Sequence, residues 1–189
     1  MHVGWIQAAC YNPPTVLGRK LLPFSPFHAL TLDAVDSPYM RGTAVDVHDL
    51  ILAVYVCSRS WADRASIIGE PESIQTWGAE QDHADWLAEM AAFRLYFQES
   101  WTIPDKWETG DKAKAKANGA YHLAVFGMRF LSMTEAAAWD CLVSRLICYR
   151  ETYSEQETGK SPLKTDDELE GIAKLKAEAA AAEVPSGTG

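Results

Sequence analysis

The sequence predicts an all-α protein, a single compact domain of five to six helices with a flexible C-terminal helix and tail. Apolar residues recur every three or four positions in several stretches, which is the spacing of one helix face. Helix-start signals precede these stretches, and no β-hairpin turn signal joins two apolar runs. The 189 residues are 48% hydrophobic, enough for one core. We expect a helical core domain at residues 1–160, with a peripheral capped helix and disordered tail at 161–189.

Two helix starts open the most apolar part of the chain, residues 17–59. Ser25 can accept a hydrogen bond from a free backbone N–H, and the proline that follows it suits the first helical position. Ser37-Pro38 ends this helix because the residue before a proline avoids the α region. Asp46 caps a second helix, whose residues 50–57 are all apolar. A buried strand is the alternative for this run, but the acidic cap and polar exit favour a buried helix.

The middle of the chain predicts one long amphipathic helix, from about residue 79 to residue 101. Its large apolar residues step by three or four positions and share one face, and such a stripe usually belongs to a core. The stripe consists of Trp86, Met90, Phe93, Phe97 and Trp101. Residues 102–118 are rich in Pro, Gly and Lys and have no periodicity, so we expect an exposed loop and a weak candidate contact site.

Two further helices are expected after this loop. Apolar spacing predicts the first at residues 119–131. Ser132 and Glu135 then have the spacing of a capping box, in which serine accepts from a backbone N–H and glutamate reaches back to the first residue. We therefore expect the second helix to begin at Ser132 and to end near Gly159.

A last helix is predicted near the C-terminus and consists mainly of Ala, Glu and Lys. Thr165 and Glu168 repeat the capping-box spacing at its start. Its apolar stripe is thin and contains Leu169, Ile172 and Leu175. Because such a stripe has little surface to bury, we expect this helix to be peripheral to the core.

Charge and hydropathy argue against several classes of function. The formal net charge is −9, whereas nucleic-acid surfaces and contacts with anionic membranes need clustered Lys and Arg. No stretch reaches the roughly 18 consecutive apolar residues of a membrane span, and the start of the chain lacks the basic and apolar regions of a secretory signal. We expect a partner other than nucleic acid or a membrane, and a partner with basic patches would complement this charge.

The four cysteines contain no Cys-x-x-Cys pair. They are Cys10, Cys57, Cys141 and Cys148. The last two lie seven positions apart in one predicted helix and so share a face, about 10 Å apart along the axis, too far for a disulfide. Small buried hydrophobic side chains are the favoured interpretation, and a zinc site is a remote alternative.

Two segments place a histidine beside carboxylates, Asp46-Val47-His48-Asp49 and Asp82-His83-Ala84-Asp85. Glu80 and His83 have the Glu-x-x-His spacing of di-iron helical bundles, but the second such motif is missing. Ordinary capped helix starts are therefore favoured, and nucleophile elbows and phosphate-binding loops are absent too. We predict no enzyme, no catalytic residue, no metal and no cofactor, with a metal-dependent helical-bundle enzyme as an unfavoured alternative.

Two segments resemble a protein family of tailed phages and prophages. The first reads GRKLLPFSPFHALTLDAVDSPY, followed by a short acidic linker and DLILAVYVCSR. The second reads FGMRFLSMTEAAAWDCLVSRLICYRETYSE. Both are similar to proteins encoded beside the tail tape-measure protein and usually described as tail assembly chaperones. The resemblance covers roughly residues 14–60 and 125–155.

This resemblance implies a non-enzymatic tail assembly protein in the host cytoplasm. Such a chaperone would bind the helical tape-measure protein and cover its apolar stripes until tail-tube subunits replace it. The alternative is a structural virion component of the neck, tail or baseplate, and a homo-oligomer is compatible with either role. Arg19 matches a position of the family pattern. It joins the candidate partner-binding residues, which are otherwise chosen by expected exposure: Trp5, Trp107, Leu169, Ile172 and Leu175.

Overall fold

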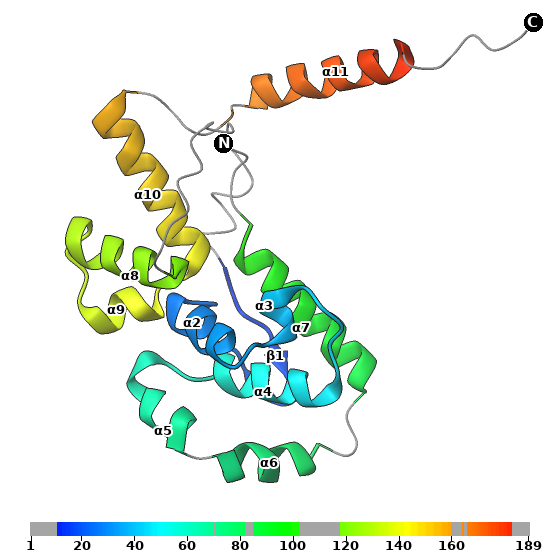
Figure 1. Cartoon of the computed structure of the whole chain (residues 1–189), viewed down its shortest axis with the longest axis vertical. Helices are drawn as coiled ribbons and strands as arrows, with labels where there is room; N and C mark the ends of the chain where they lie inside the picture. The colour runs from blue at the N-terminus through cyan, green and yellow to red at the C-terminus, as the bar shows by residue number, and fades with distance from the viewer. Residues whose placement is uncertain are drawn as a thin grey trace, which may run out of the picture.

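The computed structural model describes residues 11–69, 71–81, 85–102, 118–159, 164 and 166–182. Within these residues the chain forms ten α-helices, one 3-10 helix and one pair of two-residue strands (Figure 1). The all-α prediction is confirmed, although the helices are more numerous and shorter than expected. None of the helices in the described part is long and apolar enough to cross a membrane.

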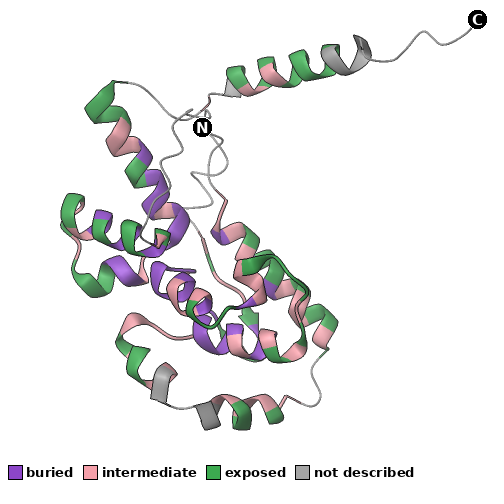
Figure 2. Ribbon diagram, viewed as in Figure 1, coloured by how far each residue is buried: buried purple, intermediate pink, exposed green. Residues whose placement is uncertain are grey.

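The elements follow one another as strands β1 (Thr15–Val16) and β2 (Arg19–Lys20), helices α2 (Pro26–Ala34), α3 (Pro38–Arg41) and α4 (Val47–Cys57), 3-10 helix η1 (Trp61–Asp63), and helices α5 (Arg64–Gly69), α6 (Pro71–Ala79), α7 (Trp86–Ser100), α8 (Gly119–Phe130), α9 (Glu135–Asp140), α10 (Val143–Thr158) and α11 (Asp166–Ala182). Helices α2 and α4 lie at the centre. Helix α2 contacts α3, α4, α8 and α9, while α4 contacts α6 and α7. The buried residues accordingly gather along α2 and α4 and where α8 and α10 meet them (Figure 2).

Both predicted helix starts of residues 17–59 are confirmed, and each has a reciprocal cap. The Ser25 hydroxyl accepts from the His28 N–H at 3.5 Å, while His28 Nδ1 accepts from the Ser25 N–H at 3.2 Å. In α4, Asp46 and Asp49 accept from each other's backbone N–H at 2.9 Å. The apolar run of α4 is a buried helix, so the strand alternative is wrong.

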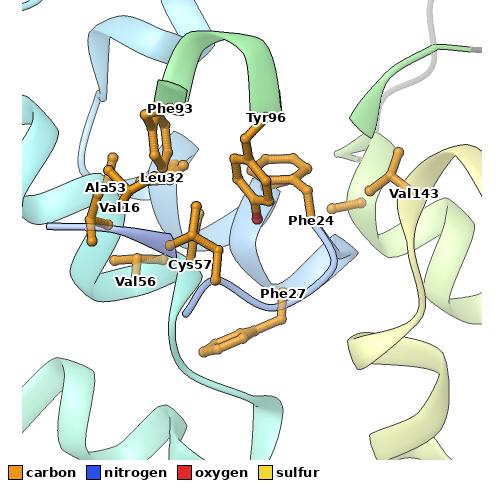
Figure 3. Packing of buried hydrophobic residues seen from close by; sticks show 14 of the residues in the cluster. Val16, Phe24, Phe27, Leu32, Ala53, Val56, Cys57, Phe93, Tyr96 and Val143 are labelled. Atoms are coloured by element: carbon orange, nitrogen blue, oxygen red, sulfur yellow. The ribbon is translucent and has the colours of Figure 1, made fainter. Parts of the chain in front are cut away.

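Phe24 joins the two sides of the core just before α2. Its ring is fully buried and lies beside the ring of Tyr96 (Figure 3). It also contacts the rings of Phe97 and Trp101. Its carbonyl accepts from the Val143 N–H at 2.9 Å, at the first residue of α10. A single residue therefore ties α7 to α10 across the start of α2.

The apolar stripe predicted for residues 86–101 packs against the core as expected. The long helix is wrong, however, because α7 begins at Trp86, where the Asp85 side chain accepts from the Ala88 N–H at 3.2 Å. Residues 71–79 form the separate helix α6, which lies across α4. The periodicity of α7 indicated the face that is buried but not the position of its cap.

The single helix predicted from Ser132 to Gly159 is wrong, because the structure holds α9 and α10 instead. Thr134 caps α9, accepting from the Ala137 N–H at 3.2 Å, whereas Ser132 has a left-handed φ of 54°. The chain is extended at Cys141 and Leu142, so Cys141 and Cys148 do not share one helix. This break is required because it buries Leu142 and lets the Val143 N–H donate to the Phe24 carbonyl. The predicted end at Gly159, with a φ of 67°, is confirmed.

A small hairpin at residues 15–20 was not expected from the sequence. Its two-residue turn places Leu17 at a φ of 47° and Gly18 at 70°, as a type I′ turn requires. Leucine rarely adopts this conformation. Here its side chain is buried, and its N–H donates to Glu89 Oε2 of α7 at 2.8 Å. The contact with α7, rather than a turn motif, holds the hairpin.

Replacing Ser132 with glycine is expected to raise the unfolding free energy by about 0.5 kcal/mol. Glycine removes the left-handed strain at this exposed residue, which outweighs its larger freedom in the unfolded chain. Urea unfolding at pH 7 measures the change. Ser154→Gly inside α10 is the control and should lower stability by about 0.5 kcal/mol. A loss of similar size in both variants would contradict this account of Ser132.

Candidate functional site

An open apolar groove of about 580 Å³ lies between α4, α6 and the first turn of α7. Its apolar lining comes from Val47, Ile51, Leu52, Ile74, Gly78, Ala79 and Trp86, and its polar lining from His48 and Gln75. These residues belong to three separate helices, so the groove exists only in the folded chain. An open, mostly apolar depression between helices is typical of a site that binds a peptide or small molecule.

Gly78 sets how closely α6 approaches α4 beside the groove. A Cβ atom at this position would lie 3.1 Å from Ile51 Cγ2, closer than ordinary van der Waals contact. The glycine therefore lets the two helices cross closely. The side chains of Ile74 and Leu52 remain half-exposed on either side, and they provide apolar surface without being part of the sealed core.

The charged residues that adjoin the lining residues in the sequence are all acidic. Residues 43–58 and 65–93, which supply every lining residue, contain no Lys or Arg. Asp46, Asp49, Glu80 and Asp85 each adjoin a lining residue in the sequence. The Asp49 N–H donates to Asp46 and lowers the pKa of that carboxyl, which keeps it ionised at neutral pH. The groove is therefore apolar inside and negative around its edge.

Arg19 lies in β2, where it connects the hairpin to two helices. Its guanidinium carbon is 4.2 Å from the ring centre of Trp77 in α6 and 5.0 Å from that of Tyr55 in α4. Burial, and then the like charge of Arg59, lower the pKa of Arg19 below its ordinary value. The sequence could not indicate this stacking, because the aromatic residues are more than thirty positions away.

The structure does not bring the predicted partner-binding residues together. Trp5 and Trp107 lie outside the described residues. Leu169, Ile172 and Leu175 lie on α11, which lies apart from the helices around the hairpin of Arg19 (Figure 1). Leu175 has 66% of its surface exposed, whereas Leu169 and Ile172 are partly buried.

No pattern in the sequence indicated the groove, chiefly because helix α6 was not predicted. Pro71 stands at its first position and is a usable start signal, followed by Ile74 and Gly78 at helical spacing. The Gly-Glu-Pro run at residues 69–71 indicated a break in the chain instead. The pairing of α6 with α4 depends on a contact between residues about 27 positions apart, Ile51 and Gly78.

Two reactive side chains away from the groove, His28 and Cys57, are buried in the core. His28 Nε2 bonds the Arg59 carbonyl at 2.7 Å inside the core. Burial raises the pKa of the Cys57 thiol, so it stays protonated. Within the described part, no three His, Cys, Asp or Glu side chains gather at metal-binding distance, and His83 lies outside that part. His28 and Cys57 are therefore held inside the core.

No protein-family model, curated protein or solved structure matches this chain. The arguments for its function therefore come from the groove and from the chemistry of the residues around it.

Proposed function

We propose that this protein is a non-enzymatic assembly chaperone that binds a helix of a client protein in the groove between α4, α6 and α7. The observation that carries the proposal is an open apolar groove whose lining residues adjoin only acidic charged residues in the sequence. Amphipathic helices bind such grooves through side chains at positions i, i+3 or i+4, and i+7. The client helix presents an apolar stripe to Ile51, Leu52 and Trp86, and basic residues along its edges meet the acidic surroundings.

The resemblance of residues 14–60 and 125–155 to tail assembly chaperones supports a particular client, the tail tape-measure protein. This client is long and helical, and its apolar stripes are uncovered before the tail tube surrounds it. Occupation of the groove by one stripe would keep the client from aggregating. An open groove suits this role, because the helix can leave when tube subunits replace the chaperone.

Replacing Leu52 with glutamine is expected to weaken client binding about tenfold, because it removes apolar contact inside the groove. Glutamine favours helices nearly as well as leucine, so α4 should persist. The measurement is co-expression with the adjacently encoded tape-measure protein, followed by co-purification, mass measurement and competitive titration. Leu95→Gln is the matched control, because Leu95 is 56% exposed on α7 and does not line the groove.

Two results would contradict the proposal. Equal weakening by both variants would mean that the groove is not the client site. No association with the tape-measure protein, together with a closed ring of this chain or its presence in purified particles, would favour a structural virion component. Binding that falls steeply with added salt is expected for basic client residues beside the acidic edge.

A further inference from the structure

Two arginines share the ring of one buried tyrosine on α4. The guanidinium carbons of Arg19 and Arg59 each lie 5.0 Å from the ring centre of Tyr55. Arg59 Nη2 also donates to the Tyr55 hydroxyl at 3.3 Å, and Arg19 additionally stacks on Trp77. Tyr55 is almost fully buried, so its ring is a fixed platform for both cations.

The backbones that carry these arginines are held independently. The Arg59 carbonyl accepts from His28 Nε2 at 2.7 Å, and its N–H donates to the Val56 carbonyl at 3.1 Å. Arg19 belongs to the hairpin that Glu89 anchors through the Leu17 N–H. Neither guanidinium depends on a carboxylate for its position, and the pair is preorganised before any ligand arrives.

Neither arginine is neutralised within the described residues, where no carboxylate lies within 4.0 Å of either guanidinium. Asp63 is near enough to feel the charge of Arg59, but its Oδ2 accepts from the Ser60 N–H and hydroxyl, both at 2.9 Å. Arg59 Nε is buried without a hydrogen-bond partner. The positive charge of Arg59 lowers the pKa of Arg19, and the buried Arg59 donor has no partner, so an anion beside both guanidinium groups would offset both costs.

We propose that Arg19 and Arg59 form a binding site for a carboxylate of a partner molecule, independent of the groove and its client. The carboxylate accepts charge-assisted hydrogen bonds from both guanidinium groups, as arginine forks favour. A small carboxylate fits better than an extended polyanion, because Glu80 and Asp63 keep the surroundings partly negative and the whole chain carries −9. The site therefore takes one Asp or Glu side chain, or one small organic acid.

The test follows the arginine Hε–Nε signals of the full chain by NMR during titration with glutarate at low ionic strength. Saturable shifts confined to Arg19 and Arg59, with one common dissociation constant, are expected. Replacing either residue with glutamine should weaken glutarate binding about tenfold or more, because one charged donor group is lost. Arg64→Gln is the matched control, since Arg64 also stacks on an indole, Trp61, and should leave binding unchanged.

Because the glutamine variants lose cation–π contacts, their folding is checked by circular dichroism. Glutarate should also raise the melting temperature of the natural chain and of Arg64→Gln, but not that of Arg19→Lys, which keeps the charge without the fork. Equal shifts at all arginines, or inorganic phosphate binding tighter than glutarate, would overturn the proposal. A peptide with blocked termini and two glutamates distinguishes a protein partner from a small organic acid as the source of the carboxylate. Binding ten times tighter than that of glutarate assigns the site to a protein partner, and equal binding assigns it to a small acid.

Discussion

Replacing Phe24 with alanine is expected to lower the unfolding free energy by about 4 kcal/mol, the typical loss for a fully buried phenylalanine. The ring lies 5.1 Å from Phe97 and 5.7 Å from Trp101, centre to centre, and also meets Tyr96 and His28. Its removal leaves a cavity between α2 and α7 that rigid aromatic neighbours cannot fill. The residue also sits where α10 is bonded to the α2 start, so the two sides of the core loosen together.

Urea unfolding, followed by tryptophan fluorescence and circular dichroism at pH 7, measures this loss. Phe130→Ala is the matched control, since Phe130 is 45% exposed and contacts Phe126 and Tyr153 at the edge of the molecule, with the Arg129 guanidinium over its ring. We expect the control to lose about 1 kcal/mol. Similar losses in the two variants would mean that Phe24 does not join the two sides of the core.

Acidification from pH 6.5 to pH 4 is expected to remove about 3 kcal/mol of stability through His28 alone. Burial lowers the pKa of His28 from 6.5 to about 4. Its Nδ1 accepts from the Ser25 N–H, so the neutral ring must carry its proton on Nε2, which donates to the Arg59 carbonyl. A second proton would point at the Ser25 N–H, beside the rings of Phe24 and Phe27.

The direction follows from proton binding. Below pH 6.5 the unfolded chain binds a proton at His28, whereas the folded chain does not bind it until about pH 4. The contribution of His28 to the unfolding free energy is therefore present above pH 6.5 and is lost as the pH falls from 6.5 to 4. Hydrogen bonds lower the pKa values of Asp46 and Asp63. The contributions of these two carboxylates to stability are therefore lost mainly below pH 4. The raised pKa of Asp140, due to burial, acts in the opposite direction near the lower end of this pH range.

Urea midpoints measured at half-unit steps between pH 7 and pH 4 test this expectation. His28→Gln should flatten the curve between pH 6.5 and pH 4, although the variant starts from a lower stability. His48→Gln should keep the full slope, because the His48 side chain is 94% exposed. An unchanged slope in His28→Gln would rule out His28 as the origin of the acid sensitivity.

Local signals in the sequence predicted several elements correctly. The caps at Ser25 and Asp46, the apolar stripe after Trp86 and the stop at Gly159 all agree with the structure. Each signal depends on atoms within a few residues, since a cap bond spans three positions and a helix face repeats every three or four. Such short-range interactions do not depend on contacts with distant segments of the chain.

Three features could not be predicted, and each depends on a distant partner. Helix α6 is placed by its crossing with α4 at Gly78, the hairpin by the bond from Leu17 to Glu89, and the break at Leu142 by the contact of α10 with Phe24. Among the candidate partner-binding residues that the structure describes, only Arg19 belongs to a proposed site. Its aromatic partners, Tyr55 and Trp77, could be identified only from the fold.

The all-α class, the main helix starts and the apolar faces that form the core could be predicted from the sequence, because they follow from capping chemistry and from the helical repeat. The positions at which helices end against one another depend on the packed fold. It assembled the groove from α4, α6 and α7, and it placed Arg19 and Arg59 on one tyrosine. The reason is physical: both features depend on packing between residues tens of positions apart, and close packing selects one arrangement among many that local propensities allow.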